Sequence, residues 1–144
     1  MDSKTFIAID LGAGSGRLIA GESDGSKLTL TEIHRFDNPG TDLPGGSFWN
    51  LLGLFREIEV GLHIAAKRFG DSITSIGIDT WGCDFALLGA HGRLLGLPHQ
   101  YRDPRHEGMP ELMHGLMAEK DAHVISRRHV TGCGDWHIHT IISS

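Results

Sequence analysis

A short apolar run that ends in an aspartate and opens into a glycine-rich turn restricts the possible folds of this chain more than any other segment. The run is Phe6–Leu11, with Asp10 near its end, and the glycines of the turn fall at positions 12, 14 and 16. The segment that follows, Arg17–Glu22, has the pattern of a second strand. The sequence therefore predicts a strand–turn–strand unit here.

This pattern excludes two familiar phosphate-binding motifs. A dinucleotide fingerprint needs G-x-G-x-x-G at the start of a helix, and a P-loop needs Gly-Lys followed by Ser or Thr. In a turn of glycine and alanine, successive backbone N–H groups can face an anion, although an ordinary tight hairpin has the same pattern. Asp10 lies at the rim, where a carboxylate can hold magnesium through water, and Ser15 and Arg17 can add donors.

The next segments predict an α/β fold with a mixed sheet. Leu28–Arg35 alternates leucine, leucine and isoleucine toward the interior, and an Asp-Gly turn precedes it, so the first three strands are expected to form an antiparallel meander. Apolar residues recur every three or four positions over Leu51–Phe69, which predicts a helix that starts after Asn50 and ends at Gly70. Ser75–Thr80 is expected to be another buried strand that ends in an aspartate.

The remaining segments carry weaker signals. Phe36–Ser47 is rich in proline and glycine and is expected to be a loop. Phe85–Leu88 is expected to continue as a strand, Leu94–Tyr101 to return from it, and Pro110–Glu119 to be helical.

Composition limits the class of protein. The 144 residues are 40% hydrophobic, which suits one domain, and the net charge of −5 with no basic stripe argues against nucleic acid as a partner. No apolar run reaches the roughly 20 residues that span a bilayer, so no membrane association is expected. Two cysteines are too few for a disulfide framework, which fits a reducing cytoplasm.

Five segments together resemble the amino-terminal domain of the FGGY carbohydrate kinases, which have an actin-like, ribonuclease-H-like fold. The segments are AIDLGAGSGR, LTLTEIHRFDN, FWNLLGLFREIEVGL, SIGIDTWGCDFALL and GLPHQYRDPR, in the order of the family. The resemblance is most specific to the members that act on L-rhamnulose. It implies transfer of the γ-phosphate of ATP to the 1-hydroxyl of that sugar, with Mg²⁺, in rhamnose metabolism. A kinase for another deoxy-ketose such as L-fuculose, and a non-catalytic actin-like module that binds a nucleotide or a partner, stay open as alternatives.

The resemblance also implies roles for individual residues. Asp10 matches a carboxylate near the magnesium ion and the reacting hydroxyl, and Gly82 matches a position whose backbone meets the sugar. The phosphate-binding loop of the family matches Ala13, Gly14, Ser15, Gly16 and Arg17.

Four further residues are candidates for the sugar site because a polyol needs charged partners for its hydroxyls and an apolar ring for its carbon face. They are Asp79, Trp81, Asp84 and Arg102. Each also suits a plainer role: core packing for the tryptophan, strand-end capping for the aspartates and an ion pair with Asp103 for the arginine.

The resemblance covers Phe6 to about Arg105. The proton-accepting aspartate and the second, carboxy-terminal domain of the family are expected beyond Ser144. Residues 1–144 are therefore expected to be a partial amino-terminal kinase domain without a catalytic base, inactive by itself. Such a piece is expected to expose apolar sheet surface, which a partner would cover.

Overall fold

The structure is a computed structural model that describes residues 4–117 and residue 121. Its contacts divide the chain into two units. The first unit comprises the residues up to Pro39 together with Asn50–Trp81, and the second comprises Gly40–Trp49 together with the residues from Gly82 onward.

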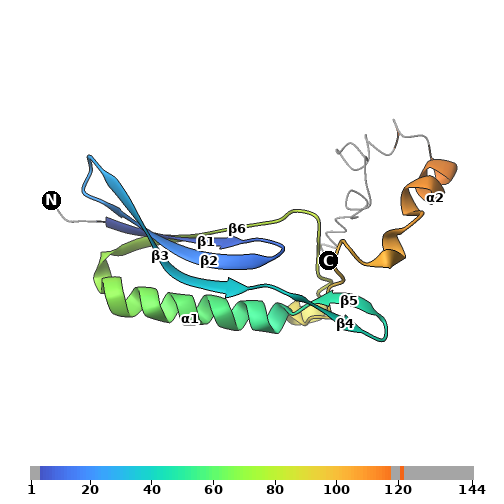
Figure 1. The fold of residues 1–144 in the computed structure, drawn as a ribbon, viewed down its shortest axis with the longest axis horizontal. Coiled ribbons are helices and arrows are strands. Elements are labelled where there is room, and N and C mark those ends of the chain that lie inside the picture. The colour runs from blue at the N-terminus through green and yellow to red at the C-terminus, as the bar shows by residue number, and fades with distance from the viewer. Residues whose placement is uncertain (1–3, 118–120, 122–144) are drawn as a thin grey trace. The chain divides into compact units, whose positions relative to one another are not determined.

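A four-stranded mixed sheet with the order β3-β2-β1-β6 forms the first unit (Figure 1). β1 (Lys4–Leu11), β2 (Ser15–Ser23) and β3 (Leu28–Asp37) are an antiparallel meander, and β6 (Ile73–Thr80) lies parallel to β1. The Asp-Gly turn between β2 and β3 places Gly25 at φ +90°, a conformation that favours glycine. The predicted mixed sheet, with its opening meander, is confirmed.

A single long helix, α1 (Leu51–Phe69), packs on one face of this sheet. It begins where the side chain of Asn50 accepts a hydrogen bond from the backbone N–H of Gly53 at 2.9 Å. It ends at Gly70, whose φ of +50° suits a glycine after a helix, and a short 3-10 turn, η1 (Gly70–Ser72), leads into β6. The predicted helix bounds are confirmed.

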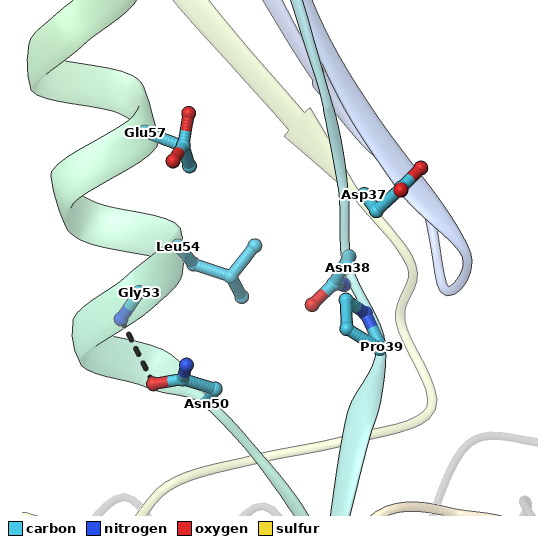
Figure 2. A pocket seen from close by; sticks show the side chains of 7 residues that line it. All are labelled: Asp37, Asn38, Pro39, Asn50, Gly53, Leu54 and Glu57. Atoms are coloured by element: carbon cyan, nitrogen blue, oxygen red, sulfur yellow. Dashed lines mark hydrogen bonds between the residues drawn. The ribbon is translucent and has the colours of Figure 1, made fainter.

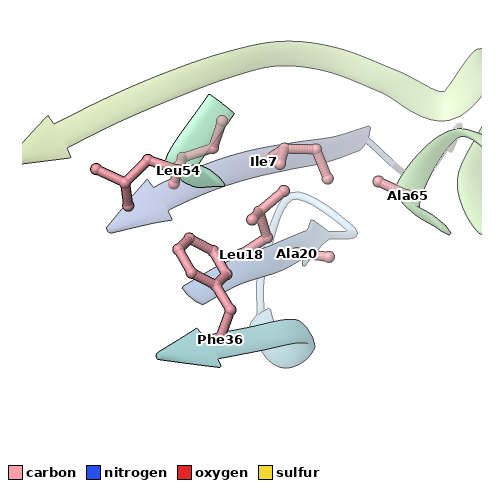
Figure 3. Packing of buried hydrophobic residues seen from close by; sticks show 7 residues of the cluster. Ile7, Leu18, Ala20, Phe36, Leu54 and Ala65 are labelled. Atoms are coloured by element: carbon pink, nitrogen blue, oxygen red, sulfur yellow. The ribbon is translucent and has the colours of Figure 1, made fainter. Parts of the chain in front are cut away.

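The core lies between α1 and the strands of the meander (Figure 3). In one place the helix backbone approaches the sheet closely, because a Cβ on Gly61 would lie 2.6 Å from Cδ2 of the fully buried Leu18. The buried cluster consists of Ile7, Ile9, Leu18, Ala20, Phe36, Leu54 and Ala65.

A β-bulge in β3 overturns one prediction about this core. Adjacent residues of β2 pair with His34 and Glu32, which leaves Ile33 as the extra residue on β3. Since a one-residue slip reverses which side chains face a given side, Leu28 and Leu30 lie on the face away from α1. They are 58% and 66% exposed, so the expectation that both leucines point inward is wrong.

The second unit contains a hairpin that the sequence did not predict. β4 (Gly40–Leu43) and β5 (Gly46–Trp49) pair antiparallel, so the loop expected over Phe36–Ser47 contains β4 and the first half of β5. All four residues of β4 are exposed, so the hairpin carries no alternation of apolar and polar residues that would indicate strands.

Beyond the hairpin, the described part of the second unit is mostly irregular. The strands expected at Phe85–Leu88 and Leu94–Tyr101 are absent from the described residues, where only isolated bridges join Leu88 to Leu94 and Phe48 to His99. The short 3-10 turns are η2 (Ala90–Gly92) and η3 (Pro104–His106). Helix α2 (Met109–Leu116) confirms the helix expected near Pro110, although the predicted end at Glu119 lies outside the described residues.

Several apolar side chains of the sheet are exposed in the described part of the chain. Ile76 and Ile78 on β6 are 52% and 62% exposed, and Phe6, Leu28 and Leu30 line the face away from α1. The expectation that Ser75–Thr80 is a buried strand is therefore wrong, because every residue of this segment is exposed at the edge of the described sheet. Over the same residues, no helix combines the length and hydropathy that a bilayer span requires.

Candidate phosphate-binding site

The turn between β1 and β2 is closed by backbone hydrogen bonds. The N–H of Gly12 donates to the carbonyl of Ser15 at 2.9 Å. Of the predicted phosphate loop, Ala13 and Gly14 form the turn itself, and the remaining three residues begin β2. The structure thus keeps the predicted strand–turn–strand unit at residues 4–23.

The three glycines of this turn have different surroundings. A Cβ on Gly16 would overlap the ring of Phe36, and a Cβ on Gly12 would lie 3.0 Å from the Ser15 carbonyl oxygen. Around Gly14 no atom lies within 4 Å of the Cβ position. Packing within the described chain therefore explains glycine at positions 12 and 16, whereas position 14 opens onto free space that a ligand can enter.

A row of charged side chains crosses three strands beside this turn. Arg17 on β2 forms an ion pair with Asp10 on β1. Its Nε donates a hydrogen bond to Oδ2 of Asp10 at 2.9 Å, and its Nη2 lies 2.8 Å from the same oxygen. The register places Asp79 of β6 directly beside Asp10. Since Asp10 alternates with the core residues Ile7 and Ile9, the row lies on the face away from α1. Two carboxylates and a guanidinium can together bind a hard cation and a phosphate.

Two other candidates of the first unit differ in surroundings. Trp81 is partly buried and packs against the core cluster, which agrees with its plainer reading as a packing residue. Asp79 is exposed at the end of β6. The structure thus brings Asp10, Arg17 and Asp79 together.

Three predicted site residues belong to the second unit. Gly82 is exposed, and Asp84 accepts a hydrogen bond from the indole Nε1 of Trp49 at 2.6 Å. The guanidinium of Arg102 lies 4.9 Å from the centre of the Tyr101 ring, a cation–π contact in place of the expected ion pair.

Asp103 is an anchoring residue that the sequence reasoning considered only as a partner for its neighbour. It is 5% exposed, and its carboxylate accepts hydrogen bonds from the backbone N–H of Ser47 at 2.7 Å and of Arg105 at 2.8 Å. Nδ1 of His99 lies 3.2 Å from the same carboxylate. An aspartate followed by a proline at the start of a helical turn is a capping signal that could have indicated this role.

These contacts predict an acid-dependent contribution of Asp103 to stability. The N–H of Arg105, then that of Ser47, lowers the pKa of Asp103 from 3.8 to about 2, since hydrogen bonds favour the charged carboxylate. A lowered folded-state pKa stabilises the fold above the unfolded value, and this stabilisation is lost as the pH falls toward 2. Urea unfolding should therefore give Asp103→Asn a lower free energy of unfolding than the parent chain at pH 5. This difference should shrink between pH 4 and pH 2.

The control for this experiment is Glu107→Gln, which neutralises an exposed carboxylate of the same unit. It should leave the pH dependence of unfolding as in the parent chain. If the free energy of unfolding of Asp103→Asn stays below that of the parent chain by the same amount from pH 5 to pH 2, the assignment of the lowered pKa to Asp103 is wrong.

A pocket of about 280 Å³ lies between the start of α1 and the end of β3 (Figure 2). Glu57 of α1, on its wall, also lies 2.7 Å from Nε2 of His34. Asn38 lines this pocket and also contacts the glycine turn, because its side-chain amide donates to the carbonyl of Gly12 at 2.9 Å. The lining residues are Asp37, Asn38, Pro39, Asn50, Gly53, Leu54 and Glu57.

Comparison with known proteins finds similarity to sugar kinases. No family model matches the chain. A rhamnulokinase of Bacteroides thetaiotaomicron is 45% identical over 120 residues, which are 83% of this chain and 24% of that protein. A rhamnulokinase of Halalkalibacterium halodurans is 44% identical over 115 residues, 79% of this chain and 24% of that protein. The chain is thus similar to rhamnulokinases over about four fifths of its length.

The chain spans about a quarter of the length of the curated relatives that it matches. Among solved structures, a gluconate kinase of Lactobacillus acidophilus has a TM-score of 0.72 at 12% identity, over 88% of this chain and 25% of that one. A Plasmodium falciparum glycerol kinase with ADP has a TM-score of 0.68 at 15% identity, over 89% of this chain and 26% of that one. These structures show the shared fold, so the predicted actin-like, ribonuclease-H-like class is confirmed.

Proposed function

We propose that this chain supplies the phosphate-binding loop and part of the sugar site of an ATP-dependent kinase that converts L-rhamnulose to L-rhamnulose 1-phosphate. The proposal rests on the 40–45% identity to four rhamnulokinases and, within the structure, on the open position at Gly14 beside the Asp10–Arg17 pair. The reaction would serve rhamnose catabolism in the cytoplasm.

On the nucleotide side, backbone N–H groups of the turn would face the β- and γ-phosphates of ATP, and Arg17 would add a charged donor. The carboxylates of Asp10 and Asp79 suit Mg²⁺, which prefers oxygen ligands and keeps several waters. Over the described residues, no three His, Cys, Asp or Glu side chains form a metal site, so waters and phosphate oxygens would complete the coordination. When bound, the ion would neutralise charge on the phosphates.

On the sugar side, the proposal keeps the backbone of Gly82 beside the substrate, with Trp81 as an apolar wall. Asp84 and Arg102 would bind hydroxyl groups. The proton acceptor and the second, carboxy-terminal domain are proposed to lie beyond Ser144, which makes residues 1–144 part of the amino-terminal kinase domain. The remainder of such an enzyme is the proposed partner for the exposed apolar sheet residues.

Gly14→Val tests the phosphate loop. The variant is made in a chimera in which this chain replaces the matching part of the Bacteroides thetaiotaomicron rhamnulokinase. A branched side chain in the open space at position 14 would displace the phosphates, so kcat/KM for ATP should fall about 10²–10³-fold, as for loss of an aligned donor.

Gly96→Val is the matched control, because position 96 also has no atom within 4 Å of the Cβ position and lies in the second unit. It should keep the kinetics of the parent chimera. Equal ATP kinetics for Gly14→Val and the parent would remove the glycine turn from the nucleotide site.

A further inference from the structure

We propose that Asn38 is a positioning residue that holds the glycine turn in the shape that binds phosphate. The inference rests on the proposed function, because it assigns a role in a site that the chain is proposed to contain. Asn38 follows β3, is 3% exposed, and makes two hydrogen bonds to a turn 26 residues earlier in the chain.

Both hydrogen bonds end on carbonyl oxygens of the turn. The side-chain Nδ2 of Asn38 donates to the carbonyl of Gly12 at 2.9 Å, and its backbone N–H donates to the carbonyl of Gly14 at 3.0 Å. One buried residue thereby fixes the orientation of two peptide groups that are two residues apart.

Fixing these carbonyls also fixes two N–H groups. In a planar trans peptide, the carbonyl of one residue and the N–H of the next point in opposite directions. The carbonyls of Gly12 and Gly14 point at Asn38, so the N–H groups of Ala13 and Ser15 point away from it. N–H groups on one side of a turn can form a concave site that favours an anion.

This arrangement requires an anchor because the turn is made of small residues. None of the glycines at 12, 14 and 16 has a positive φ, so backbone conformation alone does not select glycine there. Glycine populates many conformations, and a turn that had to be ordered by each incoming phosphate would bind it less tightly. The hydrogen bonds of the buried Asn38 preorganise the turn before a phosphate binds. Preorganised donors are what stabilise charge in a transition state.

The test uses the chimera and the variant Asn38→Ala. Loss of the side-chain hydrogen bond should lower kcat/KM for ATP on the order of 10²-fold, the cost of a misplacement of about 1 Å in a reacting group. The KM for the sugar should stay within about twofold of the parent value, since a positioning effect on the phosphates does not weaken the sugar contacts.

Asn50→Ala is the matched control. It also deletes one amide that bonds a backbone group in the first unit, but that bond caps α1. Both variants should lower the Tm, while only Asn38→Ala should change the ATP kinetics. Should Asn38→Ala fail to fold, Asn38→Asp decides, because it keeps the side-chain shape and replaces the donor to Gly12 with a carboxylate. Its kcat/KM for ATP should recover toward that of the parent chimera as the pH falls, when the carboxyl gains a proton that it can donate.

The outcomes separate this inference from the proposed function. If Gly14→Val impairs ATP use and the Asn38 variants lower only the Tm, the positioning role is wrong and the phosphate site stands. If Gly14→Val leaves ATP kinetics unchanged, the phosphate site itself is wrong, and the inference fails with it.

Discussion

A polypeptide of residues 1–144 alone is expected to form no detectable sugar phosphate from ATP, Mg²⁺ and L-rhamnulose, whereas the chimera described above is expected to be active. The chain matches only 24% of its relatives' length. The proton acceptor and the second domain are proposed to lie beyond Ser144; without the acceptor the rate would fall roughly 10²–10⁴-fold, and without a surface that aligns the second substrate about 7–11 kcal/mol of positioning would be lost. Release of ADP and formation of sugar phosphate are measured in both samples.

The same assay separates the alternative functions. Preference of the chimera for L-fuculose over L-rhamnulose would reassign the substrate. Nucleotide binding without transfer to either sugar would favour the actin-like binding module. Sugar phosphate formed by residues 1–144 alone would contradict the prediction and would place a base among Asp79, Asp84 and Asp103.

Asp10→Asn in the chimera is expected to reduce turnover much more than nucleotide affinity. The carboxylate of Asp10 is proposed to act on charge that develops during transfer, and an interaction made chiefly in the transition state affects kcat. We expect kcat to fall roughly 10²–10³-fold, the size of losing one preorganised electrostatic contact. Steady-state kinetics should show a KM for ATP within about threefold of the parent.

Asp37→Asn controls for the change of charge. Asp37 ends β3 opposite Ser15, so it is close to the turn but two strands away from Asp10. Its neutralisation should leave kcat nearly unchanged. Equal losses in the two variants would indicate a general electrostatic effect, and an unchanged kcat for Asp10→Asn would remove this residue from the site.

Local signals explain why much of the first unit could be predicted. The Asp-Gly turn fixes the second hairpin, and Asn50 and Gly70 mark both ends of α1 within its own sequence. The strand predicted at Phe6–Leu11 is present as β1, because its apolar pattern is itself a local signal. For such elements, the residues that decide the structure are neighbours in the chain.

The features that could not be predicted depend on distant partners. The β4–β5 hairpin is bonded by Gln100 and Asp103, 52 and 56 residues after the groups that they bind. The bulge at Ile33 follows from pairing with β2 and leaves no mark in an alternating sequence. Asn38 carries no signal of its own, because the Gly12 carbonyl that accepts from its side chain lies 26 residues earlier.

The anchor of the β4–β5 hairpin also has a consequence for the nascent chain on a ribosome. At about 5–20 residues per second, the 56 residues between Ser47 and Asp103 take about 3 to 11 s to synthesise. The four strands of the sheet of the first unit all end by Thr80, so they can pair during this interval. The hairpin, although made earlier, waits for its anchor and is expected to be the segment most accessible to proteases and chaperones during translation.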